Sequence, residues 1–121
     1  LAANFWRRLG ASPTVLSAED HDRKLAWTSH LPHMVSTALA LTLARAGVER
    51  GDLGPGGRDV TRLAGGSPDV WTAIARDNVA ALDVALAATE REIAKVRRAL
   101  GRADATDLRE RFATARAWFD V

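Results

Sequence analysis

Mainly apolar residues recur at steps of three and four in two long stretches of this chain, and this spacing restricts its fold more than any other feature. One series lies between residues 25 and 42, and a second lies between residues 79 and 100. No stretch of useful length alternates apolar and polar residues, as a half-buried strand would. With 121 residues, the chain is long enough for one domain with its own core. The sequence therefore predicts a single all-α domain.

Capping and breaking residues predict where the first helices begin and end. Residues 1–10 predict a short helix, and SPTVL at 12–16 predicts an extended connection, because the residue before a proline avoids the helical conformation. Ser17 is a typical N-cap for a helix that continues to about Ala46. Residues 34–44 are apolar on nearly all faces of this helix, so we expect that part to be buried on all sides.

The segment 47–68 separates the two helical runs and holds seven of the nine glycines and two of the four prolines. The stretch RDVTRLA within it predicts one or two helical turns. A loop of this length in a small domain is either functional or disordered.

Ser67 and Pro68 predict the start of a second long helix, with serine as the cap and proline at the first helical position. We expect this helix to continue to about Leu100, over roughly 50 Å. A small globule does not easily cover such a helix, so part of its apolar surface is expected to meet a second copy of the chain. The predicted fold is thus a helical dimerisation domain with a long central helix, in an intertwined homodimer. Asp104 or Thr106 caps a last helix.

Charge and composition weigh against several classes of function. The chain has 17 Lys and Arg residues and 15 Asp and Glu residues, which gives a net charge of +2. No basic stripe is interleaved with stacking aromatics, so we expect no nucleic-acid partner. The longest apolar run is shorter than the ~20 residues of a membrane span, so we expect no membrane partner. Cysteine is absent, which fits a reducing compartment such as the cytoplasm.

All three histidines lie within HDRKLAWTSHLPHMV, residues 21–35. His30 and His33 are three residues apart, so on a helix they would share a face, where they either bind a metal or ligand or simply pack. Pro32 lies between them and removes one helical hydrogen bond, at a cost of ~3 kcal/mol if nothing compensates. We therefore expect a kink here that tilts the two imidazoles apart, as strain of this kind is more common at functional sites.

A second polar group lies in GPGGRDVTR, residues 54–62. Arg58 and Arg62 are four residues apart and would face the same way on a helix, and Asp59 could orient Arg62 by a charged hydrogen bond. The alternative is an exposed loop with a surface ion pair. Arginine binds carboxylates bidentately, so these residues and the histidines predict a site for a small anion that bears a carboxylate. Trp71 follows shortly after and is either a core residue or a ligand contact.

The blocks HDRKLAWTSHLPHMVSTALA and GPGGRDVTRLAGGSPDVW, followed by a long helix, resemble the C-terminal helical domain of prephenate dehydrogenases and the related arogenate dehydrogenases. The resemblance covers essentially the whole chain. It implies that residues 1–121 form the C-terminal substrate-binding and dimerisation domain of a longer enzyme. An N-terminal Rossmann domain, absent from this chain, would bind NAD or NADP. The implied reaction is the oxidative decarboxylation of prephenate to 4-hydroxyphenylpyruvate in tyrosine biosynthesis.

The resemblance also implies roles for single residues. Arg62 is similar by motif position to the arginine that binds a substrate carboxylate, and His30 to the histidine at the start of HLPH in the substrate pocket. The other substrate-binding candidates are Asp59 in support of the arginine, Trp71 near the pocket, and His33 and Arg58. The family's catalytic histidine lies N-terminal to this chain. No catalytic, cofactor-binding or metal-binding residue is therefore assigned here, and the isolated chain is expected to be inactive.

Three functions remain open from the sequence alone. The first is the prephenate dehydrogenase domain, with arogenate as the alternative substrate. Its expected partners are a second copy of the chain and the small-molecule substrate. Its expected location is the cytoplasm. The second is a helical interaction module without catalytic activity, because the chain carries no cofactor domain. The third is a helical metal-binding protein that uses His30 and His33.

Overall fold

The computed structural model describes residues 1–121, and all of its regular secondary structure is helical. The predicted all-α fold class is confirmed. The chain divides into two compact units, Leu1–Leu82 and Asp83–Val121, each with its own internal packing. None of the helices is both long enough and apolar enough to cross a membrane.

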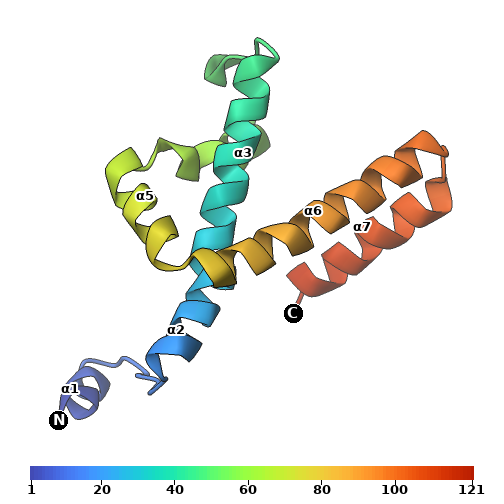
Figure 1. Cartoon of the computed structure of the whole chain (residues 1–121). Helices are drawn as coiled ribbons and strands as arrows, with labels where there is room; N and C mark the ends of the chain where they lie inside the picture. Colours follow the sequence, from blue (N-terminus) through green and yellow to red (C-terminus); the bar gives the residue numbers. More distant parts are fainter. The chain divides into compact units, whose positions relative to one another are not determined.

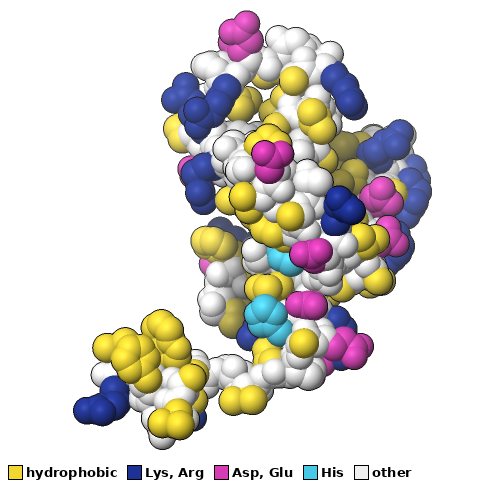
Figure 2. All heavy atoms as spheres, turned by 60° about the vertical axis from the view of Figure 1, so that its left-hand side comes forward, with side chains coloured by type: hydrophobic (Ala, Val, Ile, Leu, Met, Phe, Trp, Pro, Cys, Tyr) yellow, Lys and Arg dark blue, Asp and Glu magenta, His cyan; other side chains and the backbone are white.

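The first unit begins with α1 (Ala2–Arg8), which is followed by Gly10 at a φ of 82°. This left-handed conformation is readily adopted by glycine and ends the helix, as the sequence predicts. An extended connection then leads to Ser17. Hydrophobic side chains gather over α1 in Figure 2, and three of them are largely exposed: Phe5, Trp6 and Leu9.

Three segments continue one another along the next part of the chain: α2 (Ala18–Leu25), η1 (Ala26–His30) and α3 (Leu31–Arg45) (Figure 1). Ser17 caps α2, because its Oγ accepts a hydrogen bond of 3.1 Å from the backbone N–H of Asp20. The segment η1 is a π-helical turn, in which the N–H of Leu31 donates to the carbonyl of Ala26. The predicted helix over residues 17–46 is therefore present, with one wider turn in its middle.

Pro32 does not break this helix. It lies in the first turn of α3, directly after the wider turn of η1, where its missing N–H is tolerated. A π-helical turn thus stands at the position of the predicted kink. His30 ends this turn and His33 lies in the next one, and both residues are buried, with 8% and 5% of their surface exposed.

The prediction that residues 34–44 are buried on all sides is wrong for this chain. Within α3, the fully buried residues are His33 and Ser36, and Leu41 is half exposed. The elements with the most extensive contacts to α3 are η1, α4 and η3, and they cover only part of its surface.

The glycine-rich segment forms three short helices: η2 (Arg50–Asp52), α4 (Pro55–Thr61) and η3 (Arg62–Gly65). The predicted helical turns in RDVTRLA are confirmed. The hydroxyl of Ser36, which is buried, accepts a hydrogen bond of 3.2 Å from the backbone N–H of Ala64. This bond attaches η3 to α3.

The predicted single helix from Ser67 to Leu100 is wrong, because Asn78 divides it into α5 (Pro68–Asp77) and α6 (Val79–Gly101). The start of α5 is as predicted, with the Oγ of Ser67 accepting from the N–H of Val70 at 3.4 Å. Asn78 has a φ of −138° and a ψ of 39°, outside the helical region. Its side chain forms hydrogen bonds with two distant residues, and such bonds compete with helical conformation.

The second unit is an antiparallel hairpin of α6, from Asp83 onward, and α7 (Ala105–Phe119) (Figure 1). Asp104 caps α7, since its carboxylate accepts from the N–H of Asp107 at 3.0 Å, so the first of the two predicted caps is confirmed. Between the helices, Ala103 adopts a φ of 51°. The buried apolar side chains of this unit are the small ones of Ala85 and Ala99.

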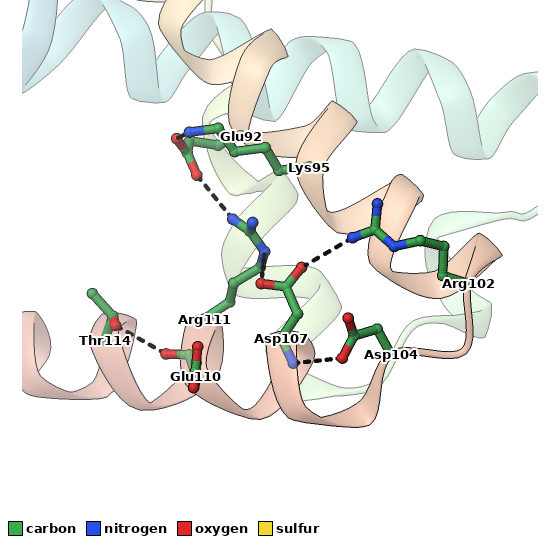
Figure 3. Close-up of polar contacts among 8 residues, drawn as sticks. All are labelled: Glu92, Lys95, Arg102, Asp104, Asp107, Glu110, Arg111 and Thr114. Carbon is green, nitrogen blue, oxygen red and sulfur yellow. Dashed lines mark hydrogen bonds and ion pairs between the residues drawn. The ribbon is translucent and has the colours of Figure 1, made fainter.

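A group of ion pairs connects the two helices of the hairpin (Figure 3). Arg111 of α7 lies 3.5 Å from Glu92 of α6, and its Nε lies 3.1 Å from Oδ1 of Asp107. The contact between Arg111 and Asp107 is an ion pair without a hydrogen bond, because the Nε–H of Arg111 does not point at the carboxylate oxygen. Arg102 lies 3.8 Å from the same carboxylate. Partly exposed pairs contribute little stability, about 0–1 kcal/mol each.

Candidate functional site

Three aromatic rings of the first unit meet: His30 at the end of η1, His33 in α3 and Trp71 in α5. The imidazole of His33 is stacked on the indole of Trp71, with ring centroids 3.5 Å apart and an angle of 16° between the planes. His30 meets the same indole edge-on, at 6.1 Å and 84°. The structure thus brings together three of the six predicted site residues.

The burial of His33 leaves one of its nitrogens without a partner. Its Nδ1 is buried and forms no hydrogen bond. Burial also lowers the pKa of the imidazole from its ordinary value of 6.5, because a charged ring loses hydration there. His33 is therefore neutral at pH 7, and its Nδ1 is a buried polar atom without a partner in the chain, which is uncommon in folded proteins.

A cavity of about 310 Å³ lies beside this stack and is lined by His33 and Trp71 together with Met34, Thr37 and Gly66. Gly66 passes close to both rings. A Cβ atom at this position would lie 2.8 Å from Cε1 of His33 and 2.8 Å from Nε1 of Trp71. Glycine permits this close approach of the backbone, which closes one edge of the cavity.

His30 is held through one of its two ring nitrogens. Its Nδ1 lies 3.3 Å from Nδ2 of Asn78, and the same amide donates to the backbone carbonyl of Asp22 at 2.8 Å. The other nitrogen, Nε2, has no partner within the chain. It is not one of the buried unpaired atoms, so it keeps contact with solvent.

Arg62 lines a second cavity, of about 440 Å³, with Leu43 of α3 and with Arg50 and Glu49 of the preceding turn. Its side chain is exposed and forms no ion pair. Ala64, two residues further on, lines both cavities. A guanidinium without an internal acidic partner is available to bind an anion.

Arg58 and Asp59 join neither cavity. The Nη2 of Arg58 lies 3.4 Å from the carbonyl oxygen of Gly51, to which it donates. The predicted hydrogen bond between Asp59 and Arg62 is absent, and Asp59 forms no other ion pair. The reason is local, because α4 ends at Thr61 and Arg62 begins a tighter 3-10 turn, which removes the helical spacing assumed for the pair.

Three residues that shape the site are not among the predictions: Asn78, Ser36 and Gly66. The contacts of the first two join residues 48 and 28 positions apart, and no local sequence pattern reveals such pairs. Asn78 alone carries a signal in the sequence, since asparagine often ends a helix.

No group of three or more His, Cys, Asp or Glu side chains lies close enough together to hold a metal ion. His30 and His33 instead face Asn78 and Trp71 respectively. The metal-binding alternative therefore has no structural observation in its favour.

Comparison with known proteins gives consistent matches. Residues 17–114 match the family model described as prephenate dehydrogenase, dimerization domain. The chain is 34% identical over 116 residues to a cyclohexadienyl dehydrogenase of Zymomonas mobilis, covering 91% of the chain and 39% of that protein. It is 33% identical over 122 residues to a prephenate dehydrogenase of Bacillus subtilis, covering 97% and 33% respectively.

Two solved structures also match over nearly the whole chain. The arogenate dehydrogenase of Synechocystis has a TM-score of 0.83 and 28% identity, covering 98% of this chain and 45% of that one. The prephenate dehydrogenase of A. aeolicus, in complex with hydroxyphenyl propionate and NAD+, has a TM-score of 0.84 and 27% identity, covering 96% and 42%. The chain thus spans less than half the length of each of these relatives. Because the family model matches most of its length, the chain belongs to the prephenate dehydrogenase family, in the region of the dimerization domain.

Proposed function

We propose that this chain is the substrate-binding and dimerisation domain of a prephenate dehydrogenase-type enzyme, at the C-terminal side of a longer cytoplasmic protein. The observation that carries the proposal is the unpaired guanidinium of Arg62, which lines a cavity beside the histidine-bearing helix α3. The bond from Ala64 to Ser36 ties the turn of Arg62 to that helix. Arginine stays ionised and binds carboxylates bidentately, so an exposed guanidinium without an acidic partner suits an anionic ligand.

The proposed reaction is the oxidative decarboxylation of prephenate. A hydride leaves the ring carbon that bears the hydroxyl group, CO2 is lost from the same ring, and the ring becomes aromatic to give 4-hydroxyphenylpyruvate. NAD or NADP would accept the hydride. The chain contains no strand and no Gly-x-Gly-x-x-Gly sequence, so we assign cofactor binding to another part of the enzyme.

Each site residue has a defined task in this proposal. Prephenate carries two carboxylates, and Arg62 would bind one of them bidentately. The stack of His33 and Trp71 offers a flat and neutral wall, since the lowered pKa of His33 keeps its ring uncharged at pH 7. His30 would donate a hydrogen bond from Nε2. Such positioning can contribute several kcal/mol to the lowering of a reaction barrier.

The relatives support an aromatic carboxylate ligand and leave two substrates to consider. The A. aeolicus enzyme is solved with hydroxyphenyl propionate, which has a ring and a carboxylate. Arogenate is the alternative substrate, since the Synechocystis relative is an arogenate dehydrogenase. Arogenate differs from prephenate by an amine in place of the side-chain keto group, so rates with both compounds on the full-length protein would separate the two.

Substitution of Arg62 tests the site directly. In the full-length protein, Arg62→Ala is expected to raise the KM for prephenate roughly 10- to 100-fold, because a charged hydrogen bond is worth about 1.5–3 kcal/mol. The measurement is the reduction of NAD+ or NADP+ at varied prephenate concentration. Arg109→Ala is the matched control, since Arg109 is exposed and unpaired in the second unit. An unchanged KM for Arg62→Ala would show that the site is assigned wrongly.

The part of the enzyme before Leu1 decides between this proposal and a non-catalytic interaction module. A Gly-x-Gly-x-x-Gly sequence between a strand and a helix is expected in the preceding coding sequence. Its absence would favour the interaction module.

We also propose that the second unit pairs with a second copy of the chain. The hairpin leaves large apolar side chains largely exposed, among them Phe112 at 70% and Trp118 at 81%. Two helices joined by small buried alanines have little core of their own, and most helix stability comes from tertiary packing. The family model, named for dimerization, supports a second copy as the partner.

Light scattering tests this pairing. The chain is expected to have a mass of twice 13.0 kDa. Phe112→Ser should weaken the dimer, whereas Val15→Ser, which removes an exposed apolar side chain from the connection after α1, should not. A stable monomer at high micromolar concentration would contradict the proposal.

A further inference from the structure

Asn78, at the break between α5 and α6, joins three parts of the first unit through its side chain. Its Nδ2 donates to the backbone carbonyl of Asp22 at 2.8 Å and lies 3.3 Å from Nδ1 of His30. A backbone carbonyl oxygen only accepts hydrogen bonds, so the amide atom that faces it must be the nitrogen. This contact therefore fixes the orientation of the amide group, whose oxygen and nitrogen are otherwise assigned from the hydrogen-bond network.

The second contact determines which nitrogen of His30 carries the hydrogen. An amide nitrogen has two hydrogens to donate and accepts none, so it can serve Asp22 and His30 at the same time. The Nδ1 of His30 must then accept. A neutral imidazole with an accepting Nδ1 carries its hydrogen on Nε2.

In this tautomer the N–H group of His30 is at Nε2, the ring nitrogen that is free to bind a ligand. His30 is 8% exposed, yet Nε2 has no partner and keeps solvent contact, since the buried unpaired side-chain nitrogens of the chain belong to His33 and Arg111. An N–H group on a ring held at its other nitrogen is a fixed donor. It is suited to an oxygen atom of a ligand.

We propose that Asn78 is a positioning residue that holds His30 in the tautomer with the hydrogen on Nε2, so that His30 donates a hydrogen bond to an oxygen of the bound substrate. The substrate part of this statement rests on the proposed function. The tautomer rests only on contacts within the chain.

Nitrogen-15 NMR of the imidazoles in the 121-residue chain tests the tautomer without any ligand. The chain has three histidines, so the spectrum is simple to assign with single His→Gln variants. At a pH where the rings are neutral, His30 is expected to show an unprotonated Nδ1 and a protonated Nε2. His21 is the reference, since it is exposed and its Nδ1 lies 3.4 Å from the Asp22 carboxylate. A hydrogen on Nδ1 of His30 in the unaltered chain would overturn the proposal.

The variant Asn78→Asp reverses the polarity of the contact at nearly constant shape. A carboxylate only accepts, so it should shift the hydrogen of His30 to Nδ1. The matched control is Asp77→Asn, which changes the charge at the neighbouring position without touching His30. Circular dichroism would establish that both variants fold. If Asn78→Asp does not fold, the tautomer of the unaltered chain still decides the question.

Kinetics of the full-length protein test the role in binding. Asn78→Asp is expected to raise the KM for prephenate roughly tenfold, the value of one lost hydrogen bond to a charged group, and Asp77→Asn should leave it unchanged. If Arg62→Ala raises KM but Asn78→Asp does not, the donor role of His30 is wrong. If neither variant changes KM, the proposed substrate site itself fails and the donor role falls with it, while the NMR result on the tautomer stands.

Discussion

The imidazole of His33 lies flat on the indole of Trp71, with ring centroids 3.5 Å apart and planes inclined by 16°. The two residues lie in different helices, α3 and α5, and their stack forms one wall of the cavity beside them. Stacked aromatic pairs are worth about 0.5–1.5 kcal/mol beyond the area they bury, so this contact both joins the helices and shapes the candidate site.

Gly66 tests how tightly the backbone is packed against this stack. Gly66→Ala would place a methyl group 2.8 Å from both rings and is expected to lower the free energy of unfolding by about 1–3 kcal/mol. The adjacent Gly65→Ala is the control, since a Cβ there meets no atom within 4 Å. Urea unfolding followed by circular dichroism measures both. Equal effects of the two substitutions would contradict the close packing at Gly66.

The buried imidazole of His33 predicts a pH dependence of stability. Its pKa is lowered by burial, so on acidification the unfolded chain binds a proton before the folded chain does. The contribution of the neutral His33 ring to the free energy of unfolding should be complete above about pH 6.5. It should be lost as the pH drops through the pKa of His33 in the folded chain. His33→Gln should remove this dependence below about pH 6.5, and the exposed His21→Gln should not. A profile unaffected by His33→Gln would refute the assignment.

Ser36 attaches the turn that carries Arg62 to helix α3. Ser36→Ala removes the acceptor for the N–H of Ala64. It should lower the free energy of unfolding by about 1 kcal/mol, because the cost of an unpaired donor is about 1–3 kcal/mol and this one is only partly buried. Ser29→Ala is the matched control, because the Ser29 hydroxyl forms no hydrogen bond. Unfolding free energies report the cost. The site assignment further predicts a raised KM for prephenate in the full-length protein, and a normal KM would show that this attachment does not position Arg62.

Ala103 predicts a stabilising substitution. Its φ of 51° is left-handed, which costs a non-glycine residue roughly 1–2 kcal/mol. Ala103→Gly removes this cost but adds freedom to the unfolded chain, so a net gain of about 0.5–1 kcal/mol is expected. The same change at the exposed Ala113, inside α7, should instead lose about 1 kcal/mol. Thermal unfolding of both variants checks the opposite signs, and a loss at Ala103 would contradict the strain.

Local chemistry made much of the fold predictable. Ser17, Ser67 and Asp104 cap helices as expected because a cap depends on hydrogen bonds within one turn. At Asn78 the prediction failed, because it considered only interactions within about one helical turn. Helical periodicity continues through this residue, and its side chain leaves the helix for partners in α2 and η1 that no local window contains.

The candidate site was predictable in its residue types and less so in its geometry. His30, His33 and Trp71 come together, while Arg62 lies on the neighbouring cavity and Arg58 and Asp59 lie outside both. Spacing along an ideal helix suggested the pair of Asp59 and Arg62. The change from α4 to a 3-10 turn at Arg62 removed it.

The sequence by itself determined the helical class and the caps, since these depend on composition and on contacts within about one helical turn. The tertiary structure decided that Pro32 is accommodated by a π-helical turn, that Gly66 touches the stack, and that Asn78 holds His30 by one nitrogen. Those outcomes depend on hydrogen bonds and packing between distant segments, whose partners are chosen only when the chain folds.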